Sequence, residues 1–195
     1  CTDQEWNSTD IMEFLKFSLS LAKERPDHMI RFDESVYRKM EQRNQIIKQM
    51  QQCVRENRFQ VWYQPIYHCG SGKFSTAEAL IRMKDLKGNP VSPSVFIPLA
   101  EQHGLIDEIS SIVLQNVGRL LGETDSSQLS AVSVNLSMQQ FMSPDLIKDL
   151  QSLSSQYQFE PGRLKLELTE RVLTEDIPRM HQIMGQLHQM GFQFA

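Results

Sequence analysis

Two carboxylates and one amide stand near the ends of three separate apolar stretches of this sequence. Glu78, Asn135 and Glu167 lie in the stretches 74–82 (FSTAEALIR), 131–136 (AVSVNL) and 164–168 (LKLEL). Oxygen-bearing side chains of this kind are the ligands that hard divalent cations prefer in proteins. An all-oxygen set therefore favours Mg²⁺ or Mn²⁺ over zinc.

The first of these stretches also carries a base. Side chains alternate between the two faces of a strand, so Glu78, Leu80 and Arg82 share one face. An acid and an arginine on one face, close to a strand end, suit a metal ion beside a phosphate. An ordinary strand with a structural Glu–Arg pair is the alternative interpretation.

The same alternation orients the other two candidates. Val132 and Val134 are expected to pack under helices, which places Asn135 on the opposite face, and Glu167 follows the same rule in its own strand. In barrels of parallel strands, catalytic residues lie at the carboxyl ends of the strands. The alternatives are a turn residue that ends the strand for Asn135, and a solvated strand end or a helix-capping partner for Glu167.

Periodicity predicts the elements that position these residues. Strands are expected over 59–67 and 74–83, which form a hairpin, and over 131–136, 164–168 and 192–195, with a short one over 28–32. Helices are expected over 10–23, 34–57, 93–103, 107–121, 176–190 and from Ser143 onward. Helix–strand alternation after a hairpin is typical of an α/β fold with a parallel sheet or barrel.

Composition narrows the class of protein further. The net charge of −4 argues against a nucleic-acid or anionic-membrane surface. The three cysteines, Cys1, Cys53 and Cys69, have no metal-ligand spacing and are interpreted as free thiols in a reducing compartment. No apolar run is long enough to span a membrane. We therefore expect a cytoplasmic segment with no DNA partner and no membrane contact of its own.

Five motifs in order resemble the signatures of the EAL domain, a family of bacterial cyclic di-GMP phosphodiesterases built on a modified (β/α)8 barrel of the TIM type. The motifs are YQPI (63–66), TAEALIR (76–82), FIPLAE with GLI (96–101 and 104–106), VNLS (134–137) and ELTE (167–170). The resemblance covers residues 58–195. Residues 1–33 resemble the C-terminal remnant of a GGDEF-like domain, and residues 34–57 resemble a linker helix.

The resemblance implies roles for particular residues. Glu78, Asn135 and Glu167 would bind Mg²⁺ or Mn²⁺, in a site that holds two metal ions in the family. Glu170 would support the active-site loop. Gln64, Leu80 and Arg82 would contact cyclic di-GMP, Arg82 at a phosphate. The products would be linear dinucleotides, and a homodimer through the barrel is a further expectation.

The sequence departs from the family pattern at its C-terminal end. The family's next motif, two adjacent aspartates, and its later lysine do not occur before Ala195. The chain is therefore expected to hold about the first half of the barrel and to be inactive by itself. The alternatives are a non-catalytic cyclic di-GMP receptor or regulatory EAL domain, and a fragment that assembles with another copy or with the remaining half.

Overall fold

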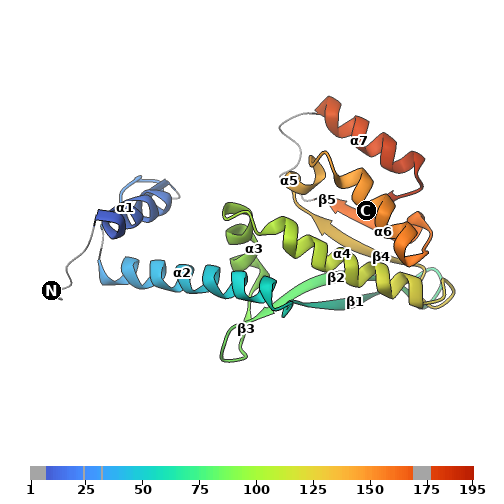
Figure 1. The fold of residues 1–195 in the computed structure, drawn as a ribbon, viewed down its shortest axis with the longest axis horizontal. Coiled ribbons are helices and arrows are strands. Elements are labelled where there is room, and N and C mark those ends of the chain that lie inside the picture. The colour runs from blue at the N-terminus through green and yellow to red at the C-terminus, as the bar shows by residue number, and fades with distance from the viewer. Residues whose placement is uncertain (1–7, 24, 32, 169–176) are drawn as a thin grey trace. The chain divides into compact units, whose positions relative to one another are not determined.

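The computed structural model describes residues 8–23, 25–31, 33–168 and 177–195. Its contacts divide the chain into two compact units, residues 1–49 and residues 50–195, which are described separately. The colours of Figure 1 follow the chain from the first unit in blue to the end of the second in red. The division of the sequence into segments 1–33, 34–57 and 58–195 stays a prediction.

The first unit contains α1 (Ser8–Lys23) and most of α2 (Glu34–Arg55), close to the predicted ranges 10–23 and 34–57. The Phe14 ring lies edge-on to Tyr37 with 5.7 Å between centroids. Before α2, the Asp33 carboxylate accepts hydrogen bonds from Ser35 and Val36, and these bonds lower the pKa of Asp33. Asp33 is thus the N-cap of α2.

The strand predicted over 28–32 is wrong for the residues described. Residues 28–31 form no strand, and His28 has a positive φ of 49°. A short extended segment becomes a strand only when a neighbouring strand satisfies its backbone groups. Among the described residues no strand pairs with this segment, which is therefore irregular.

The second unit is built on a six-stranded sheet. The predicted hairpin forms from β1 (Gln60–His68) and β2 (Lys73–Lys84), and β4 (Ala131–Leu136) and β5 (Leu164–Leu168) have the predicted bounds. The strand order is β1-β2-β4-β5-β6, with β6 at Gln193–Phe194 and the two-residue β3 (Pro90–Val91) paired to β2. Strands β2, β4, β5 and β6 run parallel to one another.

Helices connect these strands, as Figure 1 shows. They are α3 (Pro93–Gln102), α4 (Ile106–Glu123), α5 (Met138–Phe141), α6 (Leu146–Tyr157), the 3₁₀ turn η1 (Pro161–Arg163) and α7 (Ile177–Gln189). The helix expected from Ser143 begins at Leu146 instead, and α5 was not predicted. The partial parallel sheet with its crossover helices is the α/β arrangement that the sequence predicts.

The core lies between one face of the sheet and the helices. Val132, Val134, Leu164 and Leu166 are almost completely buried, together with residues of α4, α6 and α7: Val117, Leu121, Leu150, Met180, Ile183 and Leu187. The strand residues in this core are those expected under the helices. The candidate polar residues alternate with them, so burial on the helix side fixes the direction in which Asn135 and Glu167 point.

Two further features belong to the fold. No helix among the residues described is long and apolar enough to cross a membrane. Cys53 and Cys69 are both free thiols, the first buried and the second exposed. Cys1 lies outside the described residues.

Candidate functional site

Glu78, Asn135 and Glu167 lie on three adjacent strands of the sheet. In the parallel register, Glu78 of β2 is opposite Ser133 of β4, and Asn135 is opposite Glu167 of β5. The Asn135 Nδ2 group donates a hydrogen bond to Glu78 Oε1 at 2.8 Å. The structure therefore brings Glu78 and Asn135 into direct contact and places Glu167 beside Asn135 in the ladder.

The three side chains occupy the face of the sheet that the core helices leave uncovered. Asn135 is exposed although its neighbours Val134 and Leu136 are buried. Glu78 and Glu167 are half-buried. This exposure leaves carboxylate oxygens and an amide group accessible for a ligand, which a structural ion pair in the core would not do.

The donor set fits a hard divalent cation. Glu78 and Glu167 supply carboxylate oxygens, and the Asn135 amide has a carbonyl oxygen as well as the NH₂ group that now bonds Glu78. Within the described ranges, no three His, Cys, Asp or Glu side chains gather as they do around a metal ion. A cation at this position would therefore need the Asn135 amide in addition to the two acids.

Strand β1 adds Gln64 to the same face. It is directly opposite Glu78 in the antiparallel hairpin, and Trp62 is directly opposite Leu80. Directly opposed residues of antiparallel strands point to the same side, so Gln64 and Trp62 share the face of Glu78 and Leu80. Both are exposed.

The side chain of Arg82 is held from two sides. Its guanidinium carbon lies 5.6 Å from the centre of the Trp62 ring, a cation–π contact. Its Nη1 donates to the Ile81 carbonyl at 3.0 Å. Sequence reasoning missed Trp62, which is 57% exposed, although its place two residues before Gln64 on the same strand face was a usable signal.

A cavity of about 320 Å³ opens at the ends of β2 and β4. It brings together three of the predicted residues, Leu80, Arg82 and Asn135, and adds Glu101 from α3. Glu78, Glu167 and Gln64 do not line it. In the sequence the Phe96–Glu101 motif indicates only the family resemblance, whereas in the structure its last residue lines the cavity.

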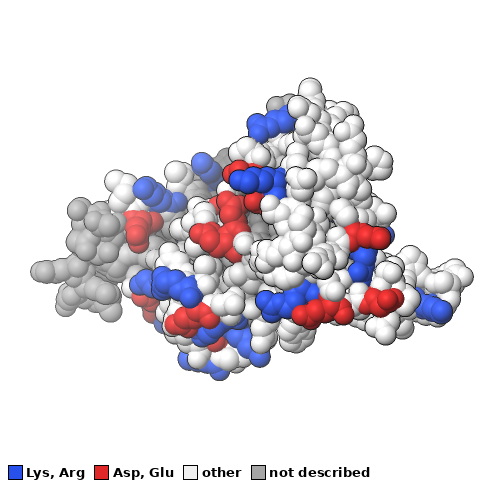
Figure 2. Space-filling model, turned by 45° about the vertical axis from the view of Figure 1, so that its right-hand side comes forward, with Lys and Arg blue, Asp and Glu red and all other residues white. Residues whose placement is uncertain are grey.

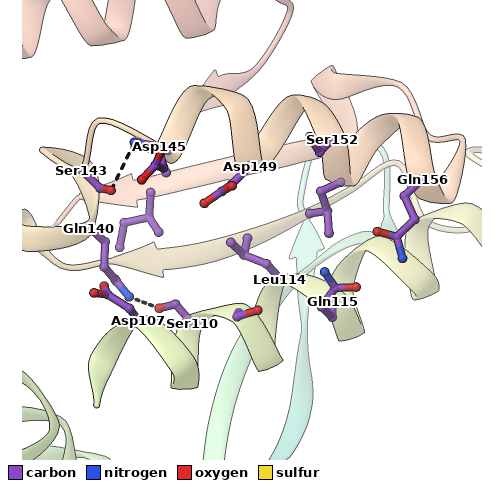
Figure 3. Close-up of a pocket in the computed structure, with 14 residues that line it drawn as sticks. Asp107, Ser110, Leu114, Gln115, Gln140, Ser143, Asp145, Asp149, Ser152 and Gln156 are labelled. Carbon is purple, nitrogen blue, oxygen red and sulfur yellow. Dashed lines mark hydrogen bonds between the residues drawn. The ribbon is translucent and has the colours of Figure 1, made fainter. Parts of the chain in front are cut away.

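A second hollow, of about 400 Å³, lies between α4 and α6 on the helix side of the sheet. Figure 3 shows that most of the residues that line it are polar, among them Asp107 and Gln115 from α4 and Asp149 and Gln156 from α6. None of the predicted site residues lines it. It shares Ser110, Leu136 and Gln140 with the cavity at the strand ends.

One predicted residue cannot be placed. Glu170, the expected support of the active-site loop, lies outside the described residues.

The surface charges do not form a patch of one sign on the face shown in Figure 2. Basic and acidic side chains are interspersed there among the residues described. That face does not present the continuous basic surface typical of nucleic-acid binding.

Comparison with known proteins shows the family to which the chain belongs. The EAL domain family matches residues 44–195, and the chain therefore belongs to the EAL domain family. It is 28% identical over 166 residues to the bifunctional diguanylate cyclase/cyclic di-GMP phosphodiesterase MucR of Pseudomonas aeruginosa, covering 82% of this chain and 24% of that protein. It is 35% identical over 112 residues to the probable cyclic di-GMP phosphodiesterase PdeB of Escherichia coli K12, covering 57% of this chain and 22% of that protein.

Solved structures confirm the fold. The PaMucR phosphodiesterase in complex with c-di-GMP matches with a TM-score of 0.72 and 28% identity, over 77% of this chain and 62% of that one. The Xanthomonas citri FimX EAL domain, also in complex with c-di-GMP, matches in fold with a TM-score of 0.68 at 21% identity. The sheet is thus part of an EAL barrel, as expected, and the chain spans about a quarter or less of the curated relatives just named.

Proposed function

We propose that this chain supplies part of the active site of a metal-dependent phosphodiesterase that hydrolyses cyclic di-GMP to the linear dinucleotide. The contact between Asn135 Nδ2 and Glu78 Oε1 carries the proposal, because it gathers side chains 57 positions apart at adjacent strand ends. Family membership and the named phosphodiesterase relatives support the choice of substrate. The activity belongs to the protein in which the barrel is closed.

The metal would be held by Glu78, Asn135 and Glu167. A bound Mg²⁺ or Mn²⁺ lowers the pKa of a coordinated water and offsets charge on the phosphoryl oxygens. The chain's own part is to fix three oxygen ligands on a rigid sheet. The β2–β4–β5 ladder would hold the backbone of these three residues in register.

The dinucleotide would lie across the hairpin beside these ligands. Arg82 would bind a phosphate, because a guanidinium offers paired donors that match two phosphate oxygens. The Trp62 ring restrains that guanidinium before the ligand binds. Gln64 and Leu80 lie on the same face and would contact the rest of the substrate.

Glu170 would hold the loop that follows β5, in keeping with its family motif. Its place is outside the described residues, so this role rests on the sequence ELTE (167–170) alone. The second metal ion, the homodimer through the barrel and the cytoplasmic location likewise stay predictions.

A non-catalytic cyclic di-GMP receptor is the second candidate function. It is favoured by the Arg82–Trp62 contact and by the shared strand face of Gln64 and Leu80, which lie on β1 and β2 and involve none of the proposed metal ligands. Ligand recognition by Arg82, Gln64 and Leu80 needs no metal. A receptor would therefore keep the hairpin contacts and lose the hydrolytic step.

Measurements on the whole gene product that contains these 195 residues separate the two candidates. Cyclic di-GMP is incubated with protein and Mg²⁺ or Mn²⁺, and the linear product is followed by chromatography, with EDTA in a parallel sample. We expect turnover that EDTA abolishes. Saturable binding of cyclic di-GMP with no linear product would instead establish the receptor.

A further inference from the structure

Gln140 is a buried polar residue that follows the candidate ligand Asn135 by five positions. It is 6% exposed, and Ser133 is the other buried polar side chain among the residues described. A buried amide is retained only when its donors and acceptors are satisfied. Its partners therefore show which parts of the structure it holds together.

One set of partners is the chain just after β4. The Ser137 backbone N–H donates to Gln140 Oε1 at 2.9 Å, and the Gln140 N–H donates to Ser137 Oγ at 3.3 Å. This reciprocal pair is a capping box at the start of α5. Only Leu136, which is 2% exposed, separates Ser137 from Asn135, so the capping box fixes the direction in which the chain leaves β4.

The other set of partners belongs to α4. Gln140 Nε2 donates to the Ile106 carbonyl at 3.1 Å, and it also contacts Ser110 Oγ. Figure 3 shows Gln140 reaching across to Ser110. One amide thus joins the exit of β4 to the first turn of α4, on the helix side of the sheet.

Asn135 is consequently held from both faces. Its side chain bonds Glu78 on the open face, and the backbone two residues later is tied by Gln140 to α4 on the opposite face. We propose that Gln140 is a positioning residue, which holds Asn135 at Glu78 through the Ser137 capping box. The predicted effect of Gln140 on metal binding rests on the proposed function. The predicted effect of Gln140 on the Asn135–Glu78 contact does not.

The first test needs no metal and uses the whole gene product. Gln140→Met removes the side-chain hydrogen bonds to Ser137, Ile106 and Ser110 at similar volume and leaves the bond from the Gln140 backbone N–H to Ser137 Oγ. Gln139→Met changes an exposed neighbour of the same chemistry and serves as the control. The readout is the pair of Asn135 side-chain NH₂ signals in a nitrogen–proton NMR spectrum, assigned by their loss in Asn135→Asp. We expect them to shift toward the positions of solvent-exposed amides in Gln140→Met and to stay in place in Gln139→Met.

A folded Gln140→Met chain with unmoved Asn135 signals would overturn the proposal. If that variant does not fold, Ser110→Ala removes a single partner of the same amide and decides the question. It should move the Asn135 signals in the same direction by a smaller amount, and unmoved signals would again contradict the positioning role.

The second test measures Mn²⁺ affinity of the whole gene product by paramagnetic resonance. Loss of a residue that orients a metal ligand weakens binding about 10–100-fold, and we expect this for Gln140→Met, with Gln139→Met unchanged. Equal affinity in the Gln140 variant and wild type would contradict the role. A wild type that binds no Mn²⁺ would contradict the proposed function instead, and the NMR result alone would then decide for Gln140.

Discussion

At the scale of single residues, the proposed function depends on where side chains point rather than on which residues are present. Glu78 and Arg82 are separated by four positions of one strand, and the alternation of that strand directs both to the face of Asn135. The structure adds two restraints that the sequence did not reveal, Trp62 against Arg82 and Asn135 against Glu78.

Arg82 should matter for substrate affinity. Replacing it by alanine removes the equivalent of one hydrogen bond to a charged group, worth about 1.5–3 kcal/mol, so the Kd for cyclic di-GMP should rise about tenfold to a hundredfold. Lys84→Ala is the matched control, because Lys84 is an exposed base two residues further on the same strand. Calorimetric titration of the whole gene product gives both Kd values; similar losses in the two variants would point to a non-specific charge effect.

The buried thiol of Cys53 gives a pH-dependence. Burial raises the pKa of Cys53 above its ordinary value, because the charged thiolate is poorly solvated there. The protonated thiol of Cys53 therefore makes its full contribution to the free energy of unfolding below the pKa of an unfolded thiol, about 8.5. That contribution is lost as the pH rises toward the pKa of Cys53 in the folded state.

Denaturant unfolding at pH 7 and pH 10 checks this contribution. The chain should lose stability over that interval, and Cys53→Ala should lose less of it, whereas the exposed Cys69→Ala variant should match the wild type. An identical loss of stability in the Cys53 and Cys69 variants would contradict the assignment.

At the scale of elements, α4 and α6 approach each other unusually closely. A Cβ atom added at Gly122 would lie 2.3 Å from the Tyr157 carbonyl oxygen, and one added at Gly118 would lie 2.6 Å from the Tyr157 ring. The contact is completed by the Tyr157 hydroxyl, which donates to Gln115 Oε1 at 2.7 Å. Position 122 therefore requires glycine. The Tyr157 carbonyl belongs to the backbone, so a change of side-chain rotamer cannot relieve the clash.

Gly122→Ala should accordingly destabilise the fold by about 1–3 kcal/mol, the usual cost of overpacking. Gly185→Ala in α7 is the control, since no atom lies within 4 Å of its added Cβ. That change should be neutral or stabilising by up to about 1 kcal/mol, because alanine is the better helix former. Thermal unfolding of both variants measures the difference, and a stabilised Gly122→Ala chain would show that α4 and α6 are further apart.

Elements with strong periodicity could be predicted from the sequence. The alternation of Val132, Val134 and Leu136 fixed the limits of β4, and the similar pattern in 164–168 fixed those of β5. The two-residue β3 has too few residues for any pattern. The short α5 was missed even though Ser137 and Gln140 have the spacing of a capping box, because the following Ser143-Pro144 gave a more familiar helix start.

The candidate site was predictable only in part, for a related reason. Parity within a strand gives the face of Glu78 or Asn135, but the register between strands decides which residues meet. The hydrogen bond between these two, 57 positions apart, depends on that register, and so does the opposition of Gln64 to Glu78. The tie from Gln140 to Ile106 joins separate elements and has no signature in local sequence.

At the scale of the whole molecule, the open face of the sheet is the central feature. Helices α4, α6 and α7 contribute the core on one side, and the oxygen ligands, Gln64 and Arg82 lie on the other. The matched chain of the PaMucR phosphodiesterase is covered to 62% by this one. Catalysis is therefore proposed for the closed barrel and not for these residues alone.

The measurement that tests the central claim most directly is the rate of linear dinucleotide formation from cyclic di-GMP at increasing Mn²⁺ concentration. It is made on the whole gene product, for the wild type, for Glu78→Ala and for Glu108→Ala, an exposed acid of α4 that serves as the control. The account predicts that the wild type and the control show the same metal-dependent rate and that Glu78→Ala shows none. A folded Glu78→Ala protein with full activity, or a wild-type rate that does not depend on metal, would contradict it.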